Sequence, residues 1–404
     1  MGGLREGKPA ARLATFLGQM REPTAAAFAP GTERFVTNDG GIVNLWDATQ
    51  KREYATTKQK TENWIERVSF SANGEIILAE GYKQPVKLLK TADGQELATL
   101  SVASVFPSPT GKTFATISGG RVRVLETSSQ QVLAEFKAHV KYKGAYGETT
   151  EFFTEIAFSP NDKSLAVSSW TGADYPEVRL WDFASKREPV YLKSKLRHVT
   201  HLAYSPDGKL LAVVAHDLVE LWDIAAGRLL AEKQAAGTLK EISFSPDVKR
   251  LFVKVENSPG NVGPLELWKV PSLTPSFPLK EQYDAEFGRF SPDGKLLATV
   301  GASRDEGPVV GLWDTATGAL LTTLKGHTDQ IYAAAFSPDG RTLATASRDN
   351  TVKLWSPHSY QLLTTLDNET PVRAVAFSPD SSVLTTGGDD GRVRLWYANA
   401  VAAQ

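Results

Sequence analysis

Three side chains in the last quarter of the chain have the types that a hydrolytic enzyme needs. They are His327, Ser347 and Asp349. In such enzymes a serine hydroxyl attacks the substrate, a histidine takes its proton and an aspartate orients the histidine. The chain has no Gly-x-Ser-x-Gly or His-Glu-x-x-His segment and no glycine-rich loop for phosphate. The elements that carry the three residues must therefore decide between catalysis and structure.

Metal-ligating residues are scattered or missing. There are no cysteines, so thiolate metal sites, disulfides and thiol catalysis are excluded. His198 and His201 are close in sequence, but their odd spacing on a strand points them to opposite faces. Asp389 and Asp390 lack the alternating acidic spacing of a calcium loop. We expect no metal and no cofactor. The other histidines are His139, His216, His327 and His358.

Composition limits the partners that the chain can attract. Its 404 residues include 45 basic and 46 acidic side chains, for a net charge of -1. No overall field draws such a chain to nucleic acid, and no apolar run is long enough for a membrane helix. The first residues lack the apolar core of a signal peptide. We expect a monomer in the cytoplasm, although a secreted location stays open if a signal peptide was removed.

A short apolar segment that ends in Leu-Trp, or in a relic of it, recurs along the whole chain. Nine such anchors stand at a mean spacing of about 44 residues, which suits a unit of four strands. Turn residues follow every strand-length segment, so the periodicity favours strands over helices. The anchors are Trp46, Leu89, Leu125, Trp181, Trp222, Trp268, Trp313, Trp355 and Trp396.

A Ser-Pro-Asp-Gly turn follows the first strand of many units. Intact copies follow Tyr204, Phe290 and Phe336. Proline presets φ for such a turn, aspartate bonds to the local backbone, and glycine accepts a positive φ. A second tight turn, as at Asp314–Gly318, follows the anchor strand. The sequence therefore predicts four antiparallel strands in each unit.

These units resemble the WD40-repeat family over essentially the whole chain. Leu-Trp-Asp itself stands at 45–47, 180–182, 221–223 and 312–314, and the Gly-His pair of the family survives once, at Gly326 and His327. The family resemblance implies that His327, Ser347, Asp349 and Trp355 form a buried hydrogen-bond chain from the indole through the hydroxyl to histidine and aspartate. The ninth repeat keeps only part of this set. It has Asp390 and Trp396, with Gly388 and Asn368 in the serine and histidine places.

The resemblance implies an all-β fold, a single closed propeller of nine four-stranded blades. Eight blades are the alternative, because the second and third anchors are leucines. The last repeat stops after its Trp strand, and residues 11–18 resemble the missing outer strand. We expect this N-terminal strand to close the ring. The expected domains are a tail at 1–10, one propeller at 11–398 and a tail at 399–404.

Insertions and unassigned aromatic residues fall on one of the two predicted rims. That rim carries the links between blades and the loops from second to third strands, expanded at 137–154, 170–177, 256–264 and 303–308. Exposed aromatics anchor interfaces, although in long loops they also fold back as plugs. The candidate partner-binding residues on this loop-rich rim are Trp64, Tyr82, Tyr142, Tyr146, Phe152, Trp170, Tyr175 and Tyr332.

These features favour a non-enzymatic scaffold that binds a protein or peptide on the loop-rich rim. The regular units resemble bacterial WD40 arrays, which often form one module of a signalling or regulatory chain. One alternative is a propeller that binds glycans or small ligands. Trp64 and Trp170 stand in different kinds of loop, which weakens it. The other is an enzyme that uses the central channel, for which no convergent acidic or histidine cluster is visible in the sequence.

Overall fold

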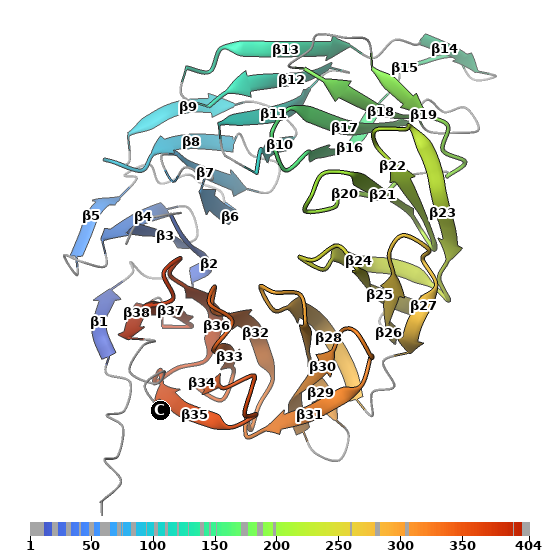
Figure 1. Cartoon of the computed structure of the whole chain (residues 1–404). Coiled ribbons are helices and arrows are strands. Elements are labelled where there is room, and N and C mark those ends of the chain that lie inside the picture. The colour runs from blue at the N-terminus through green and yellow to red at the C-terminus, as the bar shows by residue number, and fades with distance from the viewer. Residues whose placement is uncertain are drawn as a thin grey trace, which may run out of the picture. The chain divides into compact units, whose positions relative to one another are not determined.

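The computed structural model of the chain consists of strands and turns (Figure 1). In the part of the chain that it describes, no helix is long and apolar enough to cross a membrane. The described residues are 12–17, 23–29, 34–39, 42–47, 52–56, 65–70, 74, 76–81, 86–93, 95–100, 104–109, 112–118, 121–127, 129–137, 141–144, 147–150, 152–170, 177–183, 189–196, 199–258, 261–278, 283–303, 307–390 and 392–397.

The chain divides into two compact units, and the first is built from both ends of the sequence. It comprises residues 1–101, 282–314 and 319–404. Its described strands form five antiparallel four-stranded sheets. Four of these sheets contain consecutive strands: β2(Pro23–Phe28), β3(Arg34–Asp39), β4(Ile42–Asp47) and β5(Arg52–Thr56); β6(Ile65–Phe70), β7(Ile76–Gly81), β8(Val86–Lys90) and β9(Glu96–Leu100); β28(Tyr283–Phe290), β29(Leu296–Ser303), β30(Gly307–Asp314) and β31(Leu320–Lys325); and β32(Ile331–Phe336), β33(Leu343–Ser347), β34(Thr351–Trp355) and β35(Leu362–Asp367). The fifth sheet combines β36(Val372–Phe377), β37(Val383–Gly388) and β38(Arg392–Tyr397) with β1(Arg12–Leu17).

The second unit comprises residues 102–281 and 315–318. Its described strands form four sheets of the same kind and one separate hairpin. The sheets are β10(Ser104–Pro107), β11(Thr113–Ser118), β12(Arg121–Glu126) and β13(Val132–Lys137); β16(Phe152–Phe158), β17(Ser164–Trp170), β18(Glu177–Asp182) and β19(Val190–Leu192); β20(His201–Tyr204), β21(Leu210–Ala215), β22(Leu218–Asp223) and β23(Arg228–Gln234); and β24(Thr238–Phe244), β25(Arg250–Ser258), β26(Asn261–Lys269) and β27(Pro275–Pro278).

The predicted anchors are buried at the end of the third strand of their sheets. The seven anchor tryptophans are at most 4% exposed, and Leu89 and Leu125 are 1% and 9% exposed. The second strand of a sheet is buried on both faces, as all five residues of β33 show. Adjacent sheets share one core, since Leu343 and Trp355 cluster with Val300 and Leu312 of the preceding sheet. The expectation that Leu89 and Leu125 replace tryptophan as anchors is confirmed.

The Ser-Pro-Asp-Gly turns close the first two strands with a repeated set of bonds. The Ser291 hydroxyl donates to Asp293 Oδ1 at 2.7 Å and accepts from the Leu296 amide at 2.9 Å. The bond from Ser291 is the main reason why the pKa of Asp293 lies below its usual value. Gly294 has a φ of 72°, which a side chain would strain. The same serine–aspartate bond recurs at Ser205, Ser245, Ser337 and Ser378.

The N-terminal strand completes the sheet of the last repeat, as expected. β1 pairs antiparallel with β38, and the sheet order is β1-β38-β37-β36. In the first unit, β36 also lies beside β2 of the first repeat. The N-terminal residues therefore supply the strand that the last repeat lacks. Closure of a ring and the number of blades stay predictions.

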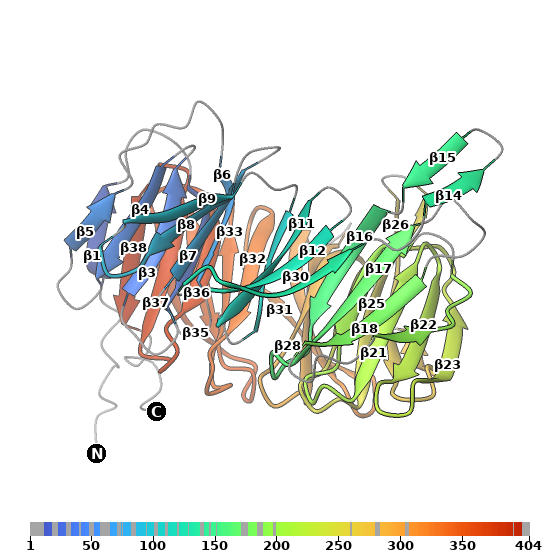
Figure 2. The same ribbon diagram turned by 90° about the horizontal axis from the view of Figure 1, so that it is seen from above.

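Several segments that were expected to be loops are strands. The 137–154 link contains a hairpin of β14(Lys141–Gly144) and β15(Gly147–Thr150), which extends away from the sheets of its unit (Figure 2). The 256–264 and 303–308 insertions lengthen strand pairs, since β25–β26 and β29–β30 continue pairing to Ser258–Asn261 and Ser303–Gly307. The prediction was wrong here because extended backbone satisfies its polar groups by pairing, even in polar sequence.

Candidate protein-binding surface

Two kinds of segment meet at one end of each sheet, which we call the loop end. Antiparallel pairing places there the link from the preceding outer strand and the connection between second and third strands. Between the β28–β31 and β32–β35 sheets this end contains a pocket of about 280 Å3, which we call the rim pocket. Its lining residues are Glu286, Gly301, Ala302, Pro308, Thr328, Asp329, Gln330 and Ile331.

One wall of the rim pocket is the link that precedes β32. Its residues are held by bonds to the loop between β33 and β34. The Thr328 amide donates to Asp349 Oδ2 at 3.0 Å, and the Arg348 amide donates to the Gln330 carbonyl at 2.8 Å. The Ser347 hydroxyl donates to the Asp329 carbonyl at 2.7 Å. These three bonds fix the backbone of the wall before any ligand arrives.

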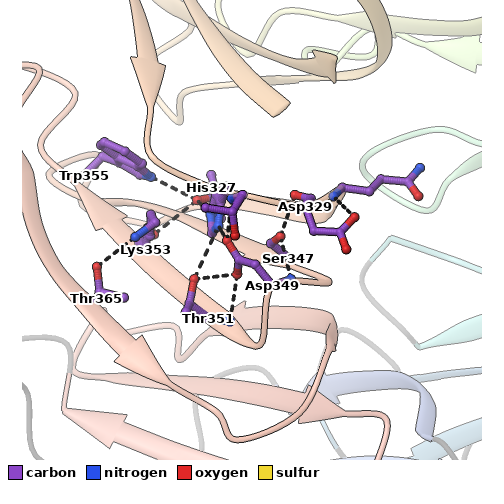
Figure 3. Close-up of polar contacts among 11 residues, drawn as sticks. His327, Asp329, Ser347, Asp349, Thr351, Lys353, Trp355 and Thr365 are labelled. Atoms are coloured by element: carbon purple, nitrogen blue, oxygen red, sulfur yellow. Dashed lines mark hydrogen bonds and ion pairs between the residues drawn. The ribbon is translucent and has the colours of Figure 1, made fainter. Parts of the chain in front are cut away.

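Behind this wall runs a hydrogen-bond chain from the anchor tryptophan to an aspartate (Figure 3). The Trp355 indole donates to Thr345 Oγ1 at 2.9 Å, and Thr345 Oγ1 lies 2.8 Å from His327 Nε2. His327 Nδ1 lies 2.7 Å from Asp349 Oδ2. The expected chain exists, but Ser347 was the wrong hydroxyl. Ser347 lies two residues further along the strand and accepts a bond from the Asp349 amide instead.

Burial and hydrogen bonds set the charge states of His327 and Asp349 in this hydrogen-bond chain. Burial lowers the pKa of His327, and the hydrogen bond that His327 donates to Asp349 offsets this only in part. Burial also opposes ionisation of Asp349, but bonds from Thr351, the Thr328 amide and His327 outweigh it and lower that pKa. A neutral imidazole then donates from Nδ1 to the carboxylate and accepts the Thr345 hydroxyl at Nε2.

The arrangement does not support a serine nucleophile. The Ser347 and Thr345 side chains are fully buried. The Ser347 hydroxyl donates to a carbonyl rather than to His327, so no base could take its proton along that bond. The described polar set therefore acts as a structural tie between the strands and the link.

In two other repeats the indole donates to a kind of acceptor that the sequence did not predict. Trp222 and Trp268 donate to glutamates two residues earlier, Glu220 at 2.9 Å and Glu266 at 2.6 Å. Trp313 instead donates to Thr299, which occupies the strand position of Thr345, at 2.8 Å. A signal was available, because an acidic residue two positions before the anchor lies on the same face of the strand as the indole.

Tyr332 is the one candidate partner-binding residue whose side chain the structure describes. The Arg373 guanidinium lies over its ring at 4.1 Å from the centroid. Arg373 also binds Asp389 with bonds of 2.7 and 3.1 Å. The ring is thus partly covered within the molecule, as part of a cation–π and ion-pair set that joins the β32 and β36 strands.

The other candidate aromatics divide into two groups. Trp64, Tyr82, Tyr146 and Tyr175 lie outside the described residues. Tyr142, Phe152 and Trp170 lie in strands rather than in the expected loops, and Phe152 opposes Trp170 where β16 pairs with β17. Whether any of the seven contacts a partner stays a prediction. Among the described residues, no group of three or more histidine, aspartate or glutamate side chains could hold a metal ion.

Comparison with known proteins agrees with the repeats. The family model described as "WD domain, G-beta repeat" matches residues 191–223, 318–356 and 360–397. The crystal structure of the computationally designed Ika8 protein resembles 86% of this chain and 99% of that one, with a TM-score of 0.57 and 20% identity. At that identity the likeness concerns the fold alone.

Curated relatives match over shorter stretches. Coronin-7 of Mus musculus is 38% identical over 24% of this chain and 11% of its own length. Eukaryotic translation initiation factor 3 subunit I of Bombyx mori is 27% identical over 38% of this chain and 47% of its own length. WD repeat-containing protein 1 of Xenopus tropicalis is 29% identical over 61% of this chain and 40% of its own length. The chain therefore matches less than half of each relative.

The sheets and their buried anchor residues define the class of the protein. It is built from repeats that each form a four-stranded antiparallel sheet with a buried anchor residue. The repeats at 191–223, 318–356 and 360–397 belong to the WD40 family.

Proposed function

We propose that the chain is a non-enzymatic scaffold that binds a protein or peptide at the loop ends of its sheets. The observation that carries this proposal is the rim pocket, whose wall is fixed by bonds from Thr328, Ser347 and Arg348. A surface that is held in place before binding loses little conformational freedom when a partner docks. The buried state of Thr345 and Ser347 speaks against hydrolysis at the adjacent polar set.

The proposal includes the architecture that the sequence predicts, a single closed ring of nine blades over residues 11–398. The nine four-stranded sheets among the described residues and the pairing of β1 with β38 support it. Electron microscopy of the purified chain gives the test, since views along the ring axis count the blades. Nine blades support the proposal, and eight would favour the alternative.

The two other candidate functions differ in where they would bind. A glycan site would use stacked aromatics, and a channel enzyme would use acidic or histidine side chains near the ring axis. A role as a module of a bacterial signalling or regulatory chain also stays a prediction, since the relatives named above come from a mouse, a moth and a frog.

Hydrogen exchange with a captured partner tests where the partner binds. A protein captured from native lysate should protect amides of 299–303 and 328–332 at the loop end. Protection confined to the turns at 291–296 and 337–342, at the opposite end of the same sheets, would contradict the proposal. These turns are the internal control, because they belong to the same two repeats.

The aromatic candidates need a separate variant. Joint replacement of Trp64, Trp170 and Tyr175 with alanine should weaken capture while circular dichroism stays unchanged. Replacement of the exposed Tyr360, in the turn between β34 and β35, is the matched control. Full capture by the triple variant would remove these aromatics from the proposed surface.

A further inference from the structure

The rim pocket has an acidic lining. Glu286 and Asp329 are among the eight lining residues that the structure describes, and none of these eight is lysine, arginine or histidine. Arg348 lies 3.8 Å from Asp329, but their side chains are 60% and 49% exposed, so solvent screens the pair. A pocket of this composition attracts a positively charged group.

Hydrogen-bond acceptors are present among the residues that line the rim pocket. Gln330 Nε2 donates to Glu286 Oε1 at 2.9 Å, and the Gln330 amide donates to Asp329 Oδ1 at 2.7 Å. Because a carboxylate only accepts, the amide nitrogen of Gln330 must face Glu286, and its side-chain oxygen is left as a further acceptor. A ligand with several N–H donors matches this set.

The size of the rim pocket and its apolar walls further restrict which ligand can fit. A volume of about 280 Å3 lies below the roughly 300–1,000 Å3 of sites for drug-sized molecules, and suits one long side chain. Ala302, Pro308 and Ile331 line the same space and can cover a methylene stem while the carboxylates meet its charged end.

We propose that the rim pocket binds the arginine side chain of a partner protein or peptide. This inference rests on the proposed function and names the group that the scaffold recognises. Arginine suits the pocket better than lysine, because its planar guanidinium offers five donors in a fixed fork that can reach two carboxylates and an amide oxygen together. Lysine presents three donors on one point charge.

A short peptide provides the probe. Saturation-transfer NMR with acetyl-Gly-Arg-Gly-amide should show binding with a dissociation constant on the order of 1 mM, as expected for so small a ligand. The peptide with citrulline in place of arginine keeps the shape but loses the charge, and it should not bind. The lysine peptide should bind several-fold more weakly.

Variants of the wall assign the signal to the pocket. Glu286→Gln and Asp329→Asn keep the side-chain volumes, and each should weaken the arginine peptide about tenfold. Ala302→Leu should block the pocket without changing its charge, and folding should tolerate it because Ala302 is exposed. Glu232→Gln, at an exposed position on the outer strand β23, is the control for loss of one negative charge and should bind as the parent does.

The results of these experiments can reject the arginine pocket without rejecting protein binding at the loop ends. Equal transfer to citrulline, or full binding by the Glu286→Gln/Asp329→Asn variant, overturns the arginine pocket. If a captured protein still protects the loop ends in that variant, only the inference fails. If capture protects the turn ends instead, the proposed function fails as well.

Discussion

The eighth and ninth repeats solve the same structural problem with different side chains. In the eighth, His327 bridges Thr345 and Asp349, so that every link from Trp355 onward has a partner. In the ninth, the Trp396 indole donates to Thr386 at 3.0 Å, and Thr386 donates to Asn368 Oδ1 at 2.7 Å. The chain of bonds stops there.

Asn368 is shorter than the histidine in the equivalent place of the eighth repeat, and the other polar contacts of the ninth repeat differ accordingly. Asp390 is bound by the fully buried Arg394 at 2.7 Å rather than by an imidazole. Asn368 Nδ2, Thr370 Oγ1 and Arg394 Nε are buried atoms without a hydrogen-bond partner among the described residues. Each such atom costs free energy, so the ninth repeat gains less from its polar set than the eighth. The complete network of the eighth repeat thus stands next to an incomplete one in the ninth.

The largest effect should come from removing the bridge of the eighth repeat. His327→Ala leaves Thr345 and Asp349 buried without their partner and opens a cavity, and should lower the free energy of unfolding by about 3 kcal/mol. Hydrogen exchange of β33 and β34 measures the loss locally. His358→Ala, at an exposed position in the turn of the same repeat, is the control. An unchanged exchange rate in His327→Ala would show that the bridge does not stabilise the sheet.

Two substitutions on β33 test which hydroxyl belongs to the hydrogen-bond chain of the eighth repeat. Thr345→Val keeps the shape but deprives Trp355 and His327 of their partner, and should cost about 2 kcal/mol. Ser347→Ala removes one bond to the Asp329 carbonyl and one from the Asp349 amide, both near the wall, and should cost about 1 kcal/mol. Urea unfolding followed by tryptophan fluorescence ranks the two. The reverse ranking would restore Ser347 as the central hydroxyl.

The choice between the hydroxyls of Ser347 and Thr345 shows what the sequence alone cannot predict. Strand order, the anchors and the joining of β1 to the last sheet follow from a pattern repeated nine times, so single irregularities do not matter. Thr345 and Ser347 both point to one face of β33, since they are two residues apart, and the sequence cannot tell which one the indole reaches. The rim pocket was invisible for another reason. Glu286 and Gln330 belong to different repeats, and only packing brings them to 2.9 Å.

The ninth repeat should respond more weakly to the equivalent change. Asn368→Ala removes the acceptor of the Thr386 hydroxyl, but it also removes the buried Nδ2 that has no partner. The two effects oppose each other, and we expect a loss of only about 1 kcal/mol. Exchange of β37 and β38 measures it. A loss as large as that of His327→Ala would mean that the incomplete network is as valuable as the complete one.

The smallest expected effect is a difference in pH dependence between the two repeats. The pKa of His327 is lowered in the folded chain, so below about pH 6.5 the unfolded chain binds more protons and stability falls. The lowered pKa of Asp349 has the same sign and takes effect only at more acidic pH. Amide exchange is intrinsically slower at pH 5 than at pH 7, so the measured rates are first corrected for the intrinsic rate. The free energy of opening of β33 and β34 should then decrease from pH 7 to 5, by less than the limit of about 1.4 kcal/mol per pH unit for one proton. His327→Gln should remove this dependence, with His358→Gln as the control. The asparagine of the ninth repeat cannot titrate, so Asn368→Gln should leave the pH dependence of β37 and β38 unaltered. An equal slope in the parent and in His327→Gln would show that the imidazole is not neutral in the fold.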